Sequence, residues 1–200
     1  RLAQTAKSDA ILQQFSTFWL KPYSLPRTCD RVLSQWQEAG FLSNDLAWQR
    51  FQKSFAANNH SLARYLVRFL QGEHQVLADQ LLNIPRDSAV WLARLQQDEK
   101  TPLNSAVLKS LLRQLSRNGH QLVVADIVRN KAHWFNNDDL VELQQVSAWH
   151  LARISGDVAN HWLSQVDAEK QPKLTETQLR YAMQEKNWLL YQKLFNQHRD

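Results

Sequence analysis

The chain has 200 residues, of which 44% are hydrophobic and 22% are charged, and it carries a formal net charge of +5. This composition is typical of a globular protein and excludes an intrinsically disordered chain. No apolar run approaches the roughly 20 residues that span a bilayer, so we expect no transmembrane helix. The basic surplus suits nucleic acid, anionic lipid or acidic polymers without choosing among them, because the lysines and arginines are spread along the chain.

Helix is the secondary structure that the composition favours. The chain has 30 leucines and 22 glutamines against 12 valines and four isoleucines, and unbranched side chains lose little rotamer freedom on a helix. All four glycines and all five prolines fall between amphipathic stretches, where they start or stop helices. Helices are predicted near residues 1–18, 27–39, 44–57, 60–70, 73–84, 87–97, 102–117, 120–131, 138–154, 157–167, 173–185 and 188–197.

Apolar stripes at helical spacing mark the faces that we expect to be buried. The clearest stripes are Trp48, Phe51 and Phe55; Leu103, Val107, Leu108, Leu111, Leu112 and Leu115; and Trp188, Tyr191, Leu194 and Phe195. Helix starts are predicted at three capping patterns, which are Thr101 with Pro102, Asp139 with Glu142, and Thr175 with Gln178. The best candidate for a strand, LVVADIV at 122–128, is also predicted to be helical.

Short helices joined by short turns, each apolar on one broad face, predict antiparallel pairs that stack into a superhelix. A weak internal repeat agrees, because Asn59, Gly119 and Asn187 align at the turns between helices. The repeat does not match the tetratricopeptide pattern. We therefore expect an all-α fold, a right-handed solenoid of about twelve short antiparallel helices, that forms a single domain over residues 1–200.

A search for catalytic and metal-binding patterns finds none. The seven histidines form no metal-binding motif, and although His150 and His161 flank a turn, no third ligand is indicated. A glycine-rich phosphate loop and a nucleophile elbow are both absent from the sequence. Asp138 and Asp139 lie at a predicted helix N-terminus, where carboxylates act as caps. We expect no catalytic residue, no metal site and no cofactor in this chain.

Tryptophan is abundant, with eight residues. A flat indole face stacks on sugars and bases, but most of these tryptophans lie on apolar stripes and are predicted to be core. Trp134, in the turn KAHWFNN, is predicted to be the most exposed. It is the candidate for stacking on a glycan.

The stretch FWLKPYSLPRTCDRVLSQWQEAG at 18–40 resembles the start of the superhelical domain of the soluble lytic murein transglycosylases of Gram-negative bacteria. The segments 46–70 and 148–163 are also similar to that domain. The residues that fill the places of the family pattern in the first stretch are Phe18, Trp19, Leu20, Leu25, Pro26, Cys29, Asp30, Trp36 and Gly40.

This resemblance implies a U-shaped stack of helices that precedes a lysozyme-like catalytic domain. Such enzymes cleave the bond between N-acetylmuramic acid and N-acetylglucosamine and leave a 1,6-anhydro product, with one glutamate as acid and then base. The family places that glutamate before a serine, and none of the seven glutamates here precedes a serine. The resemblance therefore implies an inactive interior piece of a periplasmic protein, whose catalytic domain lies outside this chain and whose ligand is peptidoglycan.

The resemblance also bears on Cys29, the single cysteine of the chain. Thiols in the periplasm tend to be oxidised, so Cys29 is expected to pair with a cysteine upstream of Arg1 in the parent protein. The alternative is a buried free thiol that packs as a small apolar residue.

Two other functions remain open at this point. One is a helical-repeat adaptor of the tetratricopeptide type, which binds a peptide in its concave groove. The other is a basic helical-repeat protein that binds nucleic acid, which requires lysines or arginines in phase with the repeat. That phasing is not evident in the sequence, so nucleic acid is not an expected partner.

Overall fold

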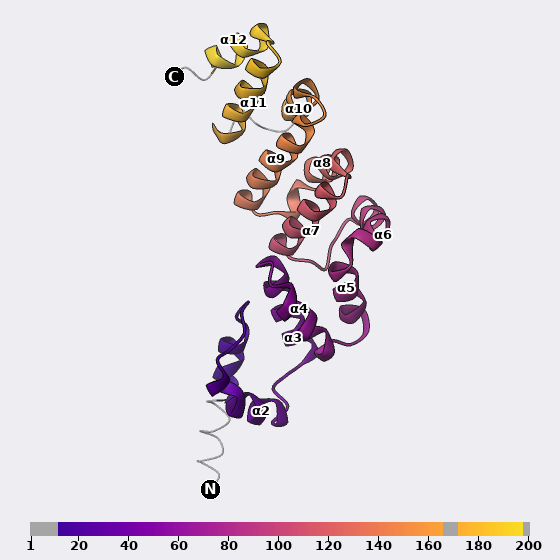
Figure 1. Ribbon diagram of the computed structural model, residues 1–200, viewed down its shortest axis with the longest axis vertical. Coiled ribbons are helices and arrows are strands. Elements are labelled where there is room, and N and C mark those ends of the chain that lie inside the picture. Colours follow the sequence, from indigo (N-terminus) through magenta and orange to yellow (C-terminus); the bar gives the residue numbers. More distant parts are fainter. Residues whose placement is uncertain (1–11, 166–171, 198–200) are drawn as a thin grey trace. The chain divides into compact units, whose positions relative to one another are not determined.

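The structure of the protein is a computed structural model, and it describes residues 12–165 and 172–197. The chain divides into two compact units, of which the first ends at Asn83 and the second begins at Ile84 (Figure 1). This division does not test the prediction of one domain over residues 1–200, which stays a prediction.

In the first unit, a helical segment at 12–19 is followed by short helices and turns. The predicted helix at 1–18 lies partly outside the described residues. The elements of this unit are η1 (Arg27–Cys29), α2 (Asp30–Glu38), α3 (Asn44–Ala56), α4 (His60–Leu66), η2 (Val67–Phe69) and α5 (Gly72–Leu82).

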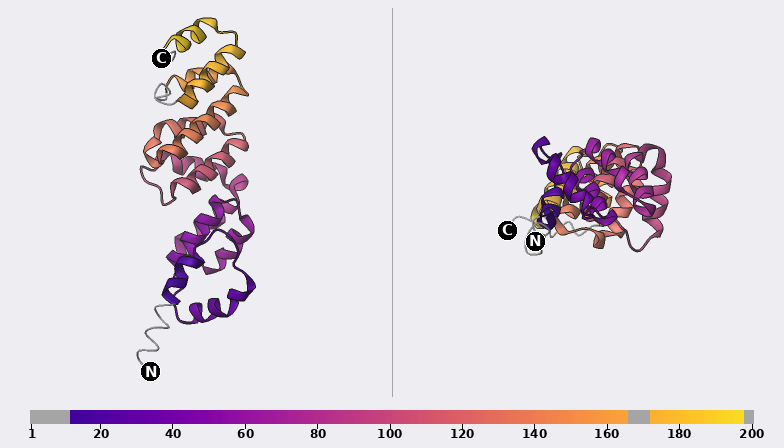
Figure 2. Two further views of the ribbon diagram at one scale, coloured as in Figure 1. Left: turned by 90° about the vertical axis from the view of Figure 1, so that its left-hand side faces the viewer. Right: turned by 90° about the horizontal axis from the view of Figure 1, so that it is seen from below.

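The second unit is a row of helices in which each packs on the next (Figure 2). Contacts also join α6 to α8, α7 to α9, and α9 to α11, so helices two places apart lie side by side. Its elements are α6 (Ile84–Gln97), α7 (Ser105–Arg117), α8 (Gln121–Asn130), η3 (Ala132–Trp134), α9 (Asn137–Ala152), α10 (Gly156–Leu163), α11 (Pro172–Gln184) and α12 (Trp188–Gln197). This confirms the predicted all-α solenoid of short antiparallel helices.

The proline-bracketed loop near the start of the first unit is held by side chains from two later helices. The guanidinium of Arg50 donates to the carbonyl oxygens of Lys21 at 3.2 Å and Tyr23 at 3.0 Å, and it lies 4.5 Å from the ring centroid of Trp19. Asn59 donates to the carbonyl oxygen of Pro22 at 3.1 Å. Burial of Arg50 lowers its pKa, because the charged form loses solvation. These bonds satisfy loop carbonyls that have no partner in a helix.

Two of the three predicted apolar stripes are buried as expected. Trp48, Phe51 and Phe55 form the core of α3, and the leucine-rich stripe of α7 is buried throughout its length. The stripe of α12 is a different case, because α12 packs on α11 and only the side that faces α11 is covered. Leu194 is buried there, while Trp188 is 61% exposed.

Four helices, α2, α3, α7 and α11, end in the same backbone turn. In each turn one residue adopts a left-handed φ, and its N–H donates to the carbonyl three residues earlier. The N–H of the following residue donates to the carbonyl five residues earlier, which completes a Schellman motif. The left-handed residues are Gly40 (φ 79°), Asn58 (φ 58°), Gly119 (φ 97°) and Lys186 (φ 56°).

The predicted internal repeat therefore corresponds to a repeated backbone turn. The predicted alignment of the repeats is wrong by one residue at Gly119. Asn59 and Asn187 follow a left-handed residue, and each side chain accepts the N–H of the residue three places on, at 3.2 Å. Gly119 is itself the left-handed residue, and His120 is the N-cap of α8.

The three predicted capping patterns are also wrong. Asn104 caps α7 by accepting the N–H of Val107, and Asn136 caps α9 by accepting the N–H of Asp139. An asparagine oxygen is among the best N-cap acceptors. Asn136 places the start of α9 upstream of the predicted Asp139, whereas Asn104 places the start of α7 downstream of the predicted Thr101. Thr175, from the third pattern, lies within α11.

We expect Lys186→Gly to raise the free energy of unfolding by about 0.5–1 kcal/mol, because glycine adopts the left-handed conformation without the strain of a Cβ atom. The matched control is Lys53→Gly, at an exposed position inside α3, which we expect to lower the same free energy by about 1 kcal/mol. Urea unfolding followed by circular dichroism measures both variants. A loss of stability in Lys186→Gly would contradict the assigned turn.

Candidate functional site

Helices α7 and α9 and the start of α8 surround an open pocket of about 400 Å³, all within the second unit. Three of its lining residues are arginines, and the others include two aromatic side chains. We call it the arginine pocket and define it by Arg113, Arg117, Gln121, Trp149, His150 and Arg153.

Helical spacing explains how these side chains meet. Arg113 and Arg117 are four residues apart on α7, and Trp149 and Arg153 are four apart at the end of α9, so each pair shares one face of its helix. The two helices pack against each other, which brings the faces to one place.

The three arginines differ in how their charge is compensated. Arg113 forms an ion pair with Glu142 of α9. No ion pair joins Arg117 or Arg153 to a carboxylate among residues 12–165 and 172–197. The guanidinium of Arg153 lies 5.5 Å from the ring centroid of Trp149, a cation–π contact that restrains both side chains at the pocket rim. The pocket therefore presents two guanidinium groups whose charge is not neutralised in the described part of the chain.

His150 lines the pocket and is 6% exposed. Its Nδ1 is hydrogen-bonded to the hydroxyl of Ser116 on α7. Burial lowers the pKa of His150 below its ordinary value of 6.5, and the charges of Arg117, Arg153 and Arg113 lower it further. The imidazole is therefore neutral at pH 7, and the positive charge of the pocket comes from its arginines.

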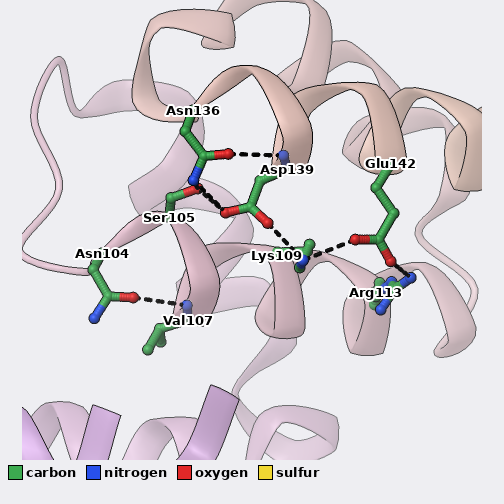
Figure 3. A network of polar contacts seen from close by, with 8 residues as sticks. All are labelled: Asn104, Ser105, Val107, Lys109, Arg113, Asn136, Asp139 and Glu142. Atoms are coloured by element: carbon green, nitrogen blue, oxygen red, sulfur yellow. Dashed lines mark hydrogen bonds and ion pairs between the residues drawn. The ribbon is translucent and has the colours of Figure 1, made fainter. Parts of the chain in front are cut away.

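A polar network joins α7 to α9 (Figure 3), and it includes Arg113 of the arginine pocket. Lys109 Nζ lies 2.5 Å from Asp139 Oδ1 and 2.8 Å from Glu142 Oε2. The hydroxyl of Ser105 donates to Asp139 Oδ2 at 2.5 Å. Because Glu142 also binds Arg113, the network sets the position of one arginine of the pocket.

The network shifts the pKa values of its members in the direction that keeps them charged. Hydrogen bonds to Asp139 and Glu142 raise the pKa of Lys109. The bond from Lys109 lowers the pKa of Glu142. Burial alone would raise the pKa of Asp139, but the bonds from Lys109 and Ser105 outweigh it, and the net shift is downward. The two carboxylates are therefore ionised, structural groups at neutral pH.

The structure changes the ranking of the tryptophans. Trp134 is half-buried in η3, where its Nε1 donates to the carbonyl oxygen of Glu99 at 3.1 Å and Lys131 Nζ lies 5.2 Å from its ring centroid. The prediction that it is the most exposed tryptophan is wrong, because Trp149 is 54% exposed and Trp188 more so. Glycan stacking by Trp134 stays a prediction.

The other residues considered in the sequence do not form a site together. His161 is exposed and its Nε2 contacts Gln165, so it does not approach the buried His150. Cys29 is a partly exposed free thiol at the end of η1. Its pairing with a cysteine upstream stays a prediction. In the described part of the chain, no group of three or more histidine, cysteine, aspartate or glutamate residues is placed to hold a metal ion.

The arginine pocket itself was missed in the sequence. Two features of the sequence pointed to this pocket. Arg113 and Arg117 belong to the densest basic group of the chain, and Trp149 and Arg153 are four residues apart, so they share one helix face. Neither pair shows in the sequence that it faces the other, because the two lie more than thirty residues apart. Among the described residues, no helix has the length and apolar character needed to cross a membrane.

Curated relatives of the chain are bacterial cell-wall enzymes. It is 24% identical over 152 residues to the soluble lytic murein transglycosylase of Escherichia coli K12, a match that covers 74% of this chain and 23% of the relative. It is 25% identical over 152 residues to the protein of the same name from Salmonella typhimurium, with the same coverage. The chain thus spans about a quarter of the length of these relatives.

The fold of the chain is similar to that of solved structures of a lytic transglycosylase. The crystal structure of the 70 kDa soluble lytic transglycosylase from Escherichia coli matches 97% of this chain and 37% of that chain, with a TM-score of 0.53 and 16% identity. Its complex with bulgecin A matches with a TM-score of 0.52.

A family model for the cucumovirus coat protein also matches, over residues 5–94. The described part of that range contains helices and turns but no strand, whereas viral capsid domains are commonly double-sheet jelly rolls. This match therefore carries no assignment.

We expect Lys109→Met to lower the free energy of unfolding by about 1–3 kcal/mol, because it leaves Asp139, whose side chain is only 13% exposed, without its cation. The matched control is Arg180→Met, which breaks an exposed pair with Glu176 and should change stability by less than about 0.5 kcal/mol. Urea unfolding at pH 7 compares the two variants. Equal effects would show that the network adds nothing to the packing of α7 on α9.

His150 makes the stability of the protein depend on pH. Its folded pKa is lowered, so the unfolded chain binds a proton that the folded chain does not as the pH falls below about 6.5. The free energy of unfolding should therefore fall by up to about 1.4 kcal/mol per pH unit below that point, and His150→Gln should remove this part of the slope.

Urea unfolding of both proteins at pH 7.5 and 5.5 measures the slope. The carboxylates with lowered pKa values titrate below this range and do not contribute to it. Identical slopes in the two proteins would refute the assignment.

Proposed function

The chain is related to the soluble lytic murein transglycosylases, and we propose that it is a non-catalytic helical scaffold of a periplasmic enzyme of this kind. In this proposal the parent protein cleaves the bond between N-acetylmuramic acid and N-acetylglucosamine in peptidoglycan and forms a 1,6-anhydro product. The catalytic domain belongs to the same polypeptide, outside these 200 residues.

The observation that carries the proposal is the agreement of two comparisons over most of the chain. The sequence match covers 74% of it and the structural match covers 97%. The matched region is less than a quarter of the relatives' length, so most of the sequence of such an enzyme lies elsewhere. Peptidoglycan, as the substrate named for the relatives, is the ligand that the proposal gives to this chain.

The structure of the second unit suits a scaffold. Each helix packs on the next, as in solenoids, where stability comes from contacts between adjacent repeats. In this proposal the row of helices restrains where an attached domain can reach. The net charge of +5 favours binding to a polymer that carries carboxylates, as the peptide stems of peptidoglycan do.

Sedimentation with purified murein sacculi at physiological salt tests the proposal. We expect the chain to sediment with the sacculi, to be released by soluble muropeptides added as competitor, and to leave the turbidity of the suspension unchanged. Lysis of the sacculi by the chain would overturn the non-catalytic assignment.

Failure to sediment would overturn the proposal in favour of one of the two other functions. A peptide-binding adaptor would bind a peptide in its groove and show no affinity for murein. A nucleic-acid-binding protein would bind single-stranded or duplex oligonucleotides, with an affinity that falls steeply as salt is raised.

A further inference from the structure

We propose that the arginine pocket binds a carboxylated sugar, with the carboxylate between Arg117 and Arg153 and the sugar ring against the indole of Trp149. This inference rests on the proposed function, which makes murein the source of the ligand. In murein this sugar is N-acetylmuramic acid, whose lactyl carboxylate is free where no peptide stem is joined to it; where a stem is attached, that carboxyl is an uncharged amide.

The charge of the pocket calls for an anion. Arg113 is neutralised by Glu142, but Arg117 and Arg153 have no carboxylate partner in the described residues. A guanidinium group presents its N–H donors in a planar fork that matches the two oxygens of a carboxylate. Two such groups in one concave site provide charge-assisted hydrogen bonds for a single carboxylate.

The size of the pocket favours a small ligand over a polymer backbone. A volume of about 400 Å³ lies in the range of sites for small molecules and suits a sugar residue with its substituents. A strand of nucleic acid needs a groove lined with cations along its length. Here only two of the three lining arginines lack a carboxylate partner in the described residues, because Arg113 is paired with Glu142. The charges thus favour one carboxylate over a polyanion.

The aromatic wall points to a ring as the rest of the ligand. Trp149 is more than half exposed although it is a large apolar side chain, and an exposed indole at the edge of a concave polar site is a common feature of binding sites. Its contact with Arg153 holds indole and guanidinium together, so one ligand can meet both. Gln121 adds an amide group for hydroxyl or acetamido groups of a sugar.

Nuclear magnetic resonance on the ¹⁵N-labelled chain tests the pocket directly. The indole N–H signal of Trp149, assigned with the variant Trp149→Phe, is followed while N-acetylmuramic acid is added. We expect a saturable shift of this signal, and at least about 10-fold weaker binding of N-acetylglucosamine, which has the same ring but no carboxylate. Lactate, which has the carboxylate but no ring, should also bind at least about 10-fold more weakly.

The variant Arg117→Gln/Arg153→Gln should weaken the binding of N-acetylmuramic acid by at least about 10-fold. The matched control is Arg31→Gln/Arg64→Gln, which removes the same charge from exposed positions that do not line the pocket and should bind as the wild type does. Circular dichroism checks that both variants are folded. If the pocket variant does not fold, each single substitution is titrated instead.

Each outcome decides the inference. No shift with N-acetylmuramic acid, equal binding of N-acetylglucosamine or lactate, or equal binding by the pocket variant overturns it. A stronger shift with inorganic phosphate or an oligothymidylate overturns it in favour of a phosphate site. Sedimentation with sacculi without binding of the free sugar refutes the pocket alone, and binding of the sugar without sedimentation refutes the proposed function alone.

Discussion

Burial of the leucine-rich face of α7 is the constraint on which the second unit depends. A helix of this length is marginal on its own in water, and α7 gains its stability by packing its apolar stripe against α6, α8 and α9. When that stripe is buried, the face of α7 that points away from the stripe takes a fixed position relative to α9. The basic side chains on this face, including Lys109, Arg113 and Arg117, then have one set of neighbours, and both the polar network and the arginine pocket follow from it.

The same face of α7 separates structural charges from charges that are available to a ligand. Lys109 and Arg113 meet carboxylates of α9, and these contacts hold the two helices in register. One turn further along the helix, Arg117 meets no carboxylate in the described residues and faces the pocket with Arg153. Two guanidinium groups without a carboxylate partner in the described residues thus lie at one site, where a buried neutral histidine adds no charge of its own.

The relationship to the transglycosylases holds at low sequence identity because it depends on packing. The family-like stretch at 18–40 contains Trp19 and Trp36, which are fully buried and lie 5.2 Å apart between ring centroids. The loop between them is held by Arg50, a residue outside that stretch. Because the fold depends on buried packing of this kind, a match of 24% identity can accompany a shared fold.

Local periodicity was enough to predict the helices of this protein, most of their ends and the buried stripes of α3 and α7, because these depend on residues three and four apart. Helix starts were less predictable, because several possible cap residues lie close together in the chain. Helix α9 is capped by Asn136, upstream of the expected Asp139, and α7 by Asn104, downstream of the expected Thr101. The exposure of Trp149 and its meeting with Arg117 were decided by the packing of α7 on α9. These residues are more than thirty positions apart in the chain. They become neighbours only when the apolar faces of their helices are buried together, and a local sequence pattern cannot predict that contact.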